Sequence, residues 1–213
     1  MARILLVAPS HDTPTYFTAV MAKAMEEYAE RRGHTIATLY GPRAVRRYFE
    51  RTARNADVIV YIGHGVKNKW VGQLPQGQRK ALLNRDNINT LNGKAVIAIA
   101  CWGATLGNIA VMSDARTYIG WDNVVYIGGL ERGRTYVKDF AHTFYELIFD
   151  IADGKTPRVA VDDYKMLCSH YEDVYTREKP IFWQTYKGYM RHNRFNTVSY
   201  THLRAHETEA DLV

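Results

Sequence analysis

The sequence predicts an α/β fold in which a mostly parallel sheet carries helices on both faces. Three short runs of apolar, largely β-branched residues, at 3–7, 35–39 and 57–62, have the length of buried strands. Between them lie two segments whose apolar residues recur at helical spacing. Because this alternation of strands and helices requires crossover connections, the strands are expected to pair in parallel.

Capping and breaking residues set the ends of the first two helices. Thr13 is expected to cap the first helix, with Pro14 in its first turn, where proline is favoured. Gly33 ends this helix, because glycine readily adopts the backbone conformation that terminates one. Pro42 opens the second helix, which is expected to continue to about residue 55.

The second half of the chain is less regular. Residues 66–93 are rich in glycine and asparagine and are expected to form a long loop that contains a short helix within 78–91. The other expected elements are a strand at 95–100, a short helix at 106–112, strands at 117–121 and 124–127, helices at 135–152 and 157–171, and a last strand at 181–186.

The composition is that of a globular domain, with 46% hydrophobic and 23% charged residues in 213. No apolar stretch approaches the roughly 20 residues that span a bilayer, so no membrane partner is expected. The net charge of +6 comes without a nucleic-acid-binding motif, so we interpret it as surface charge and expect no nucleic-acid partner. Two cysteines are too few for a disulfide framework, which predicts a cytoplasmic setting. The oligomeric state stays open.

The end of the chain differs from the rest. Residues 199–213 resemble a peptide obtained by translating a sequencing adapter, and they lack the periodicity of a core element. We therefore expect a single domain at 1–198 and a non-native tail at 199–213 that takes no part in function.

Two of the predicted strands end in reactive side chains. The strand at 57–62 leads into His64-Gly65, and the strand at 95–100 leads into Cys101. Chemistry in parallel sheets collects beyond the carboxyl ends of the strands. If these two strands are neighbours, an imidazole and a thiol face each other as proton shuttle and nucleophile. The second cysteine, Cys168, lies among apolar residues of a predicted helix and is expected to serve packing.

This pair of motifs resembles the caspase-like cysteine peptidases, the group of caspases, metacaspases, legumain, clostripain and gingipains. In that group an apolar strand ending in His-Gly precedes one ending in Ala-Cys. Ala100-Cys101-Trp102-Gly103 also fits most of the caspase pentapeptide Gln-Ala-Cys-x-Gly. Ile99 stands where caspases have the glutamine that helps hold an acidic substrate residue, so preference for aspartate is not expected.

The resemblance implies a caspase-like three-layer α/β/α fold with a mostly parallel six-stranded sheet. It also implies a cysteine endopeptidase whose catalytic dyad is His64 and Cys101, acting on peptides or proteins without a cofactor. No third catalytic residue is required by the group. The backbone N–H groups of Gly65 and Cys101 are the candidate oxyanion hole, which would stabilise the tetrahedral intermediate.

In the group that the sequence resembles, the primary substrate pocket is lined at the ends of the first, fourth and fifth strands. Substrate-binding residues are therefore expected at the corresponding places in this chain. Asp12, Trp102 and Asp122 are the candidates, and two carboxylates suit an arginine or lysine side chain of the substrate. Asp12 could instead cap a helix or form a turn, Asp122 could form a turn, and Trp102 could pack under the long loop. No metal-binding motif is present, so no metal site is expected.

Two other functions remain open. The chain could be an inactive relative of the caspase-like group that binds peptides or proteins through the same cleft. It could also be a flavodoxin-like domain that binds a small ligand, with the turn at 10–15 holding an anion.

Overall fold

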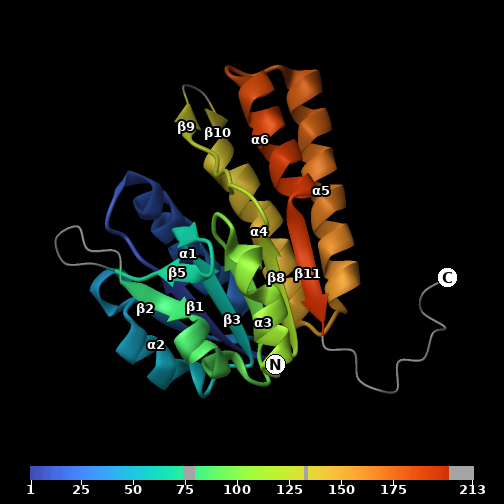
Figure 1. Ribbon diagram of the computed structural model, residues 1–213. Coiled ribbons are helices and arrows are strands. Elements are labelled where there is room, and N and C mark those ends of the chain that lie inside the picture. The colour runs from blue at the N-terminus through green and yellow to red at the C-terminus, as the bar shows by residue number, and fades with distance from the viewer. Residues whose placement is uncertain (74–79, 132–133, 202–213) are drawn as a thin grey trace, which may run out of the picture.

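The computed structural model describes residues 1–73, 80–131 and 134–201, and its centre is a six-stranded sheet (Figure 1). The strand order is β11-β8-β7-β3-β1-β2. Five strands pair in parallel, and β11 runs antiparallel to β8 at one edge. The strands are β1 (Arg3–Ala8), β2 (Thr35–Tyr40), β3 (Val58–Ile62), β7 (Ala95–Ile99), β8 (Thr117–Trp121) and β11 (Thr197–Thr201).

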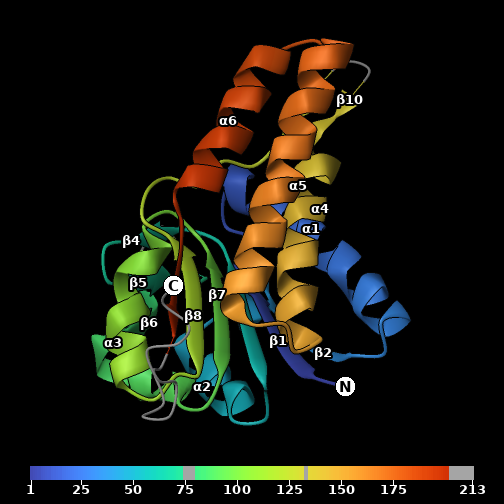
Figure 2. The ribbon, with the colours of Figure 1, turned by 90° about the vertical axis from the view of Figure 1, so that its right-hand side faces the viewer.

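Helices cover both faces of the sheet, as expected from the sequence (Figure 2). Alternate residues of each strand enter two separate cores, so that Val60 and Ile62 face one layer while Ile59 and Tyr61 face the other. The first layer contains α1 (Thr13–Arg31), α4 (Tyr136–Ala152), α5 (Pro157–Glu178) and α6 (Trp183–Phe195). The second layer contains α2 (Arg46–Ala53) and α3 (Gly107–Met112). The three-layer α/β/α prediction is therefore confirmed.

The cap of α1 is Asp12 and not Thr13. Asp12 has an extended backbone, and its carboxylate accepts a hydrogen bond from the backbone N–H of Thr15, while the Thr15 hydroxyl accepts one from the backbone N–H of Asp12. This reciprocal pair satisfies two backbone donors at the start of the helix. Thr13 is thereby the first helical residue, followed by Pro14.

The long loop expected at 66–93 is a small antiparallel sheet followed by a short helix. The strands are β4 (Gly65–Val66), β5 (Lys69–Val71) and β6 (Ala81–Asn84), and the 3-10 helix η2 spans Arg85–Leu91. Trp70 anchors this sheet, because its buried ring stacks on Tyr61 with 4.7 Å between ring centroids and its indole N–H donates to the Tyr118 hydroxyl. Residues 74–79 of the expected loop lie outside the described residues.

The strand expected at 124–127 is not formed. The backbone N–H and carbonyl of Tyr126 bond the side-chain amide of Asn193, and the N–H of Val125 bonds the sulfur of Cys101. These hydrogen bonds to side chains take the place of the backbone hydrogen bonds that a neighbouring strand would provide.

The last strand expected at 181–186 is wrong, because this segment begins helix α6 at Trp183. Trp183, Tyr186 and Met190 recur at helical spacing and pack on the α4 and α5 side of the molecule. The sixth strand is β11, in which Ser199 pairs with Ile119 and Thr201 pairs with Thr117. The strand therefore continues three residues past the expected domain end at 198, and residues 202–213 lie outside the described residues.

Among the described residues, the helices are too short or too polar to span a lipid bilayer.

Candidate active site

The two strands that lead to the candidate dyad are neighbours in the sheet. β3 and β7 pair in parallel, with Ile62 opposite Ile99, and the N–H of Gly63 continues the ladder to the Ile99 carbonyl at 3.2 Å. His64 and Cys101 each lie two residues beyond this last pair. Both residues therefore leave the sheet at the same edge, at the carboxyl ends of adjacent strands.

Cys101 occupies a tight turn between β7 and the 3-10 helix η3 (Gly103–Leu106). Trp102 has φ 52° and ψ 25°, a left-handed conformation that costs energy for a residue with a side chain. The Trp102 N–H bonds the Asn123 carbonyl at 2.9 Å, which holds the turn against the segment after β8. Cys101 is partly exposed, and its sulfur accepts a hydrogen bond from the N–H of Val125 at 3.5 Å.

The start of β4 packs directly on the backbone of Cys101. A Cβ atom on Gly65 would overlap the Cys101 carbonyl oxygen, and it would also touch the Ala100 side chain. Only glycine permits this approach without a shift of the backbone. The His64-Gly65 segment and the Cys101 turn are therefore held together by backbone packing.

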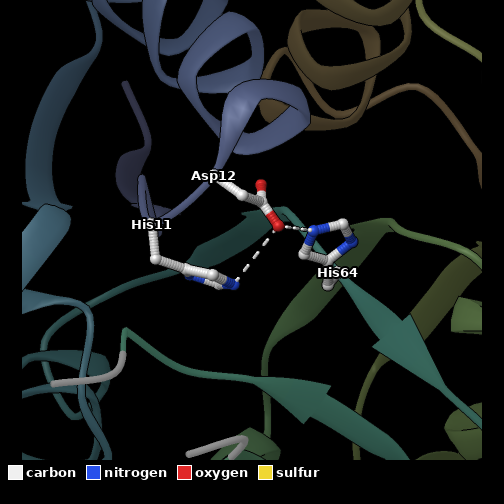
Figure 3. Close-up of side chains that lie close together, drawn as sticks. All are labelled: His11, Asp12 and His64. Atoms are coloured by element: carbon white, nitrogen blue, oxygen red, sulfur yellow. Dashed lines mark hydrogen bonds and ion pairs between the residues drawn. The ribbon is translucent and has the colours of Figure 1, made fainter. Parts of the chain in front are cut away.

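His64 is hydrogen-bonded to Asp12, which the sequence did not predict (Figure 3). The His64 Nε2 atom lies 2.6 Å from Asp12 Oδ2, while Asp12 Oδ1 accepts hydrogen bonds from the backbone N–H and the hydroxyl of Thr15. Burial opposes ionisation of Asp12, but these hydrogen bonds outweigh it and lower the pKa of the carboxyl to about 2. Asp12 is therefore a carboxylate at neutral pH.

His11 is a third polar residue at this edge that sequence reasoning missed. Its Nε2 atom lies 3.8 Å from Asp12 Oδ2, and its ring centroid lies 5.5 Å from that of His64. The His11 side chain is only 17% exposed, whereas those of Asp12 and His64 are 39% and 37% exposed. These residues meet because β1 and β3 are adjacent in the sheet, where Val7 pairs with Tyr61. His11 follows Val7 by four residues, and His64 follows Tyr61 by three.

Within residues 1–73, 80–131 and 134–201, no hydrogen bond joins the Cys101 sulfur to the His64 ring. The ring bonds Asp12 and the sulfur bonds Val125 in this state. The structural relationship between the two groups is therefore their position at the carboxyl ends of the paired strands β3 and β7, and not a direct hydrogen bond.

The other predicted site residues lie around this edge. Trp102, which directly follows Cys101, is half-buried. Asp122 is exposed just after β8, and its backbone N–H donates a hydrogen bond to the Asn196 carbonyl. Ile99 is 2% exposed and belongs to the core. Cys168 is fully buried, and burial raises the pKa of its thiol to about 12, in keeping with a packing role.

No family model matches the sequence, and no curated protein matches it significantly. The structure matches 18 solved chains. One is the Arg-specific cysteine proteinase gingipain R, with a TM-score of 0.56 and 11% identity over 94% of this chain. Another is the complex of pro- and mature domains of RgpB from Porphyromonas gingivalis, with a TM-score of 0.49 and 10% identity over 92% of this chain. This chain spans 46% of the length of either neighbour. At this identity the likeness concerns the fold alone, and the chain has a caspase-like α/β fold.

Proposed function

We propose that this protein is a cysteine endopeptidase with Cys101 as nucleophile and His64 as proton carrier. The observation that carries the proposal is the in-register pairing of β3 with β7, since it brings imidazole and thiol to one sheet edge. His64 takes the thiol proton, and the thiolate attacks the peptide carbonyl carbon. The protonated imidazole then gives its proton to the leaving amine. Water, deprotonated by His64, cleaves the resulting thioester and regenerates the thiol.

Asp12 acts in this proposal as a positioning residue. An ionised carboxylate can only accept a hydrogen bond, so its contact with Nε2 requires that this nitrogen carry the proton. The other ring nitrogen, Nδ1, then holds the free electron pair that accepts the thiol proton. The same negative charge stabilises the imidazolium that forms during attack.

Two backbone donors support an oxyanion hole at Gly65 and Cys101. The Val71 N–H donates to the His64 carbonyl, and pairs in antiparallel strands alternate between bonded and non-bonded. The next pair, Gly65 with Trp70, is thus non-bonded, and the Gly65 N–H points away from β5. The Cys101 N–H has no acceptor among the residues that the structure describes, so it too is available to an oxyanion.

For the substrate we propose cleavage after arginine or lysine, with Trp102 as a wall of the cleft. Both Asp12 oxygens already have partners, so the basic side chain would pair with Asp122. Asp122 is exposed, and the residue after it bonds the Trp102 backbone. A carboxylate in this place attracts a cationic side chain and disfavours an acidic one.

The flavodoxin-like alternative has less support. An anion at the turn before α1 would need the free N–H groups of the helix N-terminus. Asp12 occupies that position with its own negative charge, which repels a phosphate. An inactive peptide-binding relative would keep the cleft without needing the His64–Asp12 hydrogen bond, so turnover decides between it and the peptidase.

The test is a panel of fluorogenic peptides that differ only in the residue before the cleaved bond. The wild-type chain is expected to cleave arginine and lysine peptides, and Cys101→Ala and His64→Ala are expected to abolish turnover. Cys168→Ala is the matched control, since it removes a thiol that lies in the core and is expected to keep activity. Binding without cleavage in every variant would favour the inactive relative, and a preference for aspartate or asparagine would overturn the proposed specificity.

A further inference from the structure

Three metal-ligating side chains meet where β1 and β3 end. One ligand atom each from His11, Asp12 and His64 lie within 4.8 Å of one another. Asp12 Oδ2 is the common point, 2.6 Å from His64 Nε2 and 3.8 Å from His11 Nε2, and Figure 3 shows both rings approaching it. In tetrahedral zinc sites with bonds of about 2.0–2.2 Å, ligand atoms are roughly 3.4 Å apart. Small side-chain shifts would therefore bring all three atoms to a single ion.

The chain holds the three ligands on a rigid support. β1 and β3 are paired neighbours, and Asp12 is fixed as the cap of α1 by two hydrogen bonds from Thr15. Two imidazoles and one carboxylate are a donor set that suits zinc with an open coordination position. The Asp12 oxygen nearest both rings is Oδ2, whereas Oδ1 is the one that holds the cap of α1, so the helix cap and the cation would use different oxygens.

We propose that His11, Asp12 and His64 form an exchangeable Zn²⁺ site and that zinc bound there inhibits the protein. The exposed fractions of Asp12 and His64, 39% and 37%, leave the ion open to solvent, so water completes its coordination. The main alternative is a zinc ion held by Cys101 and His64 without His11. In that case zinc binding would depend on Cys101 and not on His11.

Inhibition follows from the two nitrogens of His64, and this part rests on the proposed peptidase function. In the free protein Nε2–H donates to Asp12 and Nδ1 carries the electron pair that takes the thiol proton. When zinc binds Nε2, that nitrogen's proton leaves and Nδ1 takes up one, so the ring stays neutral. No free electron pair is then left on the ring, and His64 cannot accept the proton of Cys101.

Binding is tested first, on the full chain after removal of metal with a chelator. Isothermal titration with Zn²⁺ and absorption with Co²⁺ are expected to show one site. His11→Gln is expected to weaken Zn²⁺ binding at least roughly tenfold, because it removes one of three ligands. His170→Gln is the matched control, since His170 is exposed on α5 and is not one of the three clustered residues, and this variant should bind zinc as the wild type does. Equal thermal stability of both variants would show that the fold is intact.

Activity is tested separately with the preferred fluorogenic peptide. Zinc is expected to inhibit the wild-type chain and EDTA to restore it, whereas His11→Gln should be active without metal and need at least roughly tenfold more zinc for the same inhibition. If no variant cleaves peptides, the peptidase proposal fails, but the titration still decides the zinc site. Unchanged zinc binding in His11→Gln, or a loss in Cys101→Ala instead, would overturn the site proposed here.

Discussion

The Nε2 atom of His64 lies 2.6 Å from the Oδ2 atom of Asp12, a residue 52 positions earlier in the chain. The other carboxylate oxygen of Asp12 caps helix α1 through Thr15. One side chain thus links the orientation of the proposed base to the start of a helix. The sequence predicts Asp12 either as a substrate-binding residue or as a helix cap. In the structure it caps α1 and is hydrogen-bonded to His64.

Replacing Asp12 by asparagine separates these two roles. Asparagine is as good a helix cap as aspartate, so Asp12→Asn should keep α1 intact. It removes the charge that stabilises the imidazolium and the requirement that Nε2 carry the proton. We expect kcat/KM to fall by roughly 10-fold to 1000-fold, by analogy with the usual contribution of an oriented proton carrier. A steady-state assay within twofold of wild type would show that Asp12 does not position His64.

The pH dependence of stability should carry the signature of the same carboxylate. The pKa of Asp12 is lowered from 3.8 to about 2 in the folded chain, so its ionised form stabilises the fold. This contribution is complete above the unfolded pKa, near pH 4, and is lost as pH falls through about 2. Denaturant titrations should therefore show a larger loss for Asp12→Asn at pH 6 than at pH 2. Since the side chain is 39% exposed, solvent screening keeps the effect small.

Asp57→Asn is the matched control for this series. Hydrogen bonds from Arg3 lower the pKa of Asp57 to about 2 as well, but this pair lies at the opposite end of β1 and β3. Its stability should follow the same pH trend while kcat/KM stays unchanged. A pH-independent difference between wild type and Asp12→Asn would contradict the assignment of an ionised, hydrogen-bonded carboxylate.

Gly65 should tolerate no larger side chain. A Cβ atom there would overlap the Cys101 carbonyl oxygen, which is backbone and cannot rotate away. We expect Gly65→Ala to lower the free energy of unfolding by roughly 1–3 kcal/mol and to reduce kcat/KM, since Cys101 must move. At Gly188, in the middle of α6, a Cβ meets no atom within 4 Å. Gly188→Ala should be neutral or stabilising by up to about 1 kcal/mol. Similar results for both variants would argue against close packing at Gly65.

The place where the domain ends is tested by two truncations. Stopping after Val198 removes three of the five residue pairs between β11 and β8, together with the hydrogen bond from the Thr117 hydroxyl to the Tyr200 carbonyl. We expect a loss of roughly 1–3 kcal/mol in the free energy of unfolding. Stopping after Thr201 keeps all five residue pairs between β11 and β8 and should leave stability unchanged. Equal stability of the two truncated chains would instead support the domain boundary predicted at 198.

Much of the fold is predictable because its inner strands are buried on both faces. β3 and β7 are fully buried, and such strands are continuous apolar runs in the sequence. The segment at 181–186 misleads, since Ile181, Phe182 and Trp183 have the composition of a strand. The helical spacing of Trp183, Tyr186 and Met190 is the better signal, because it places these side chains on one face of α6.

The candidate site was predictable only in part, for a physical reason. His64 and Cys101 follow strand ends, and strand ends can be recognised from hydrophobic runs. The contacts of Asp12 and His11 with His64 depend on β1 lying beside β3, which no spacing in the sequence encodes. The cluster of His11, Asp12 and His64 joins two loops that lie 52 positions apart in the sequence, so no local sequence motif indicates it.

Covalent trapping tests the central claim most directly. The full chain is incubated with a peptide acyloxymethyl ketone that carries arginine before the reactive group, and the adduct is located by mass spectrometry. The thiolate of Cys101 is expected to displace the carboxylate leaving group in a single adduct, while buried Cys168, whose thiol pKa is raised to about 12, stays unmodified. His64→Ala should slow the reaction, and Cys101→Ala should abolish it. No adduct on Cys101, or equal labelling of both cysteines, would contradict an active site built from His64 and Cys101.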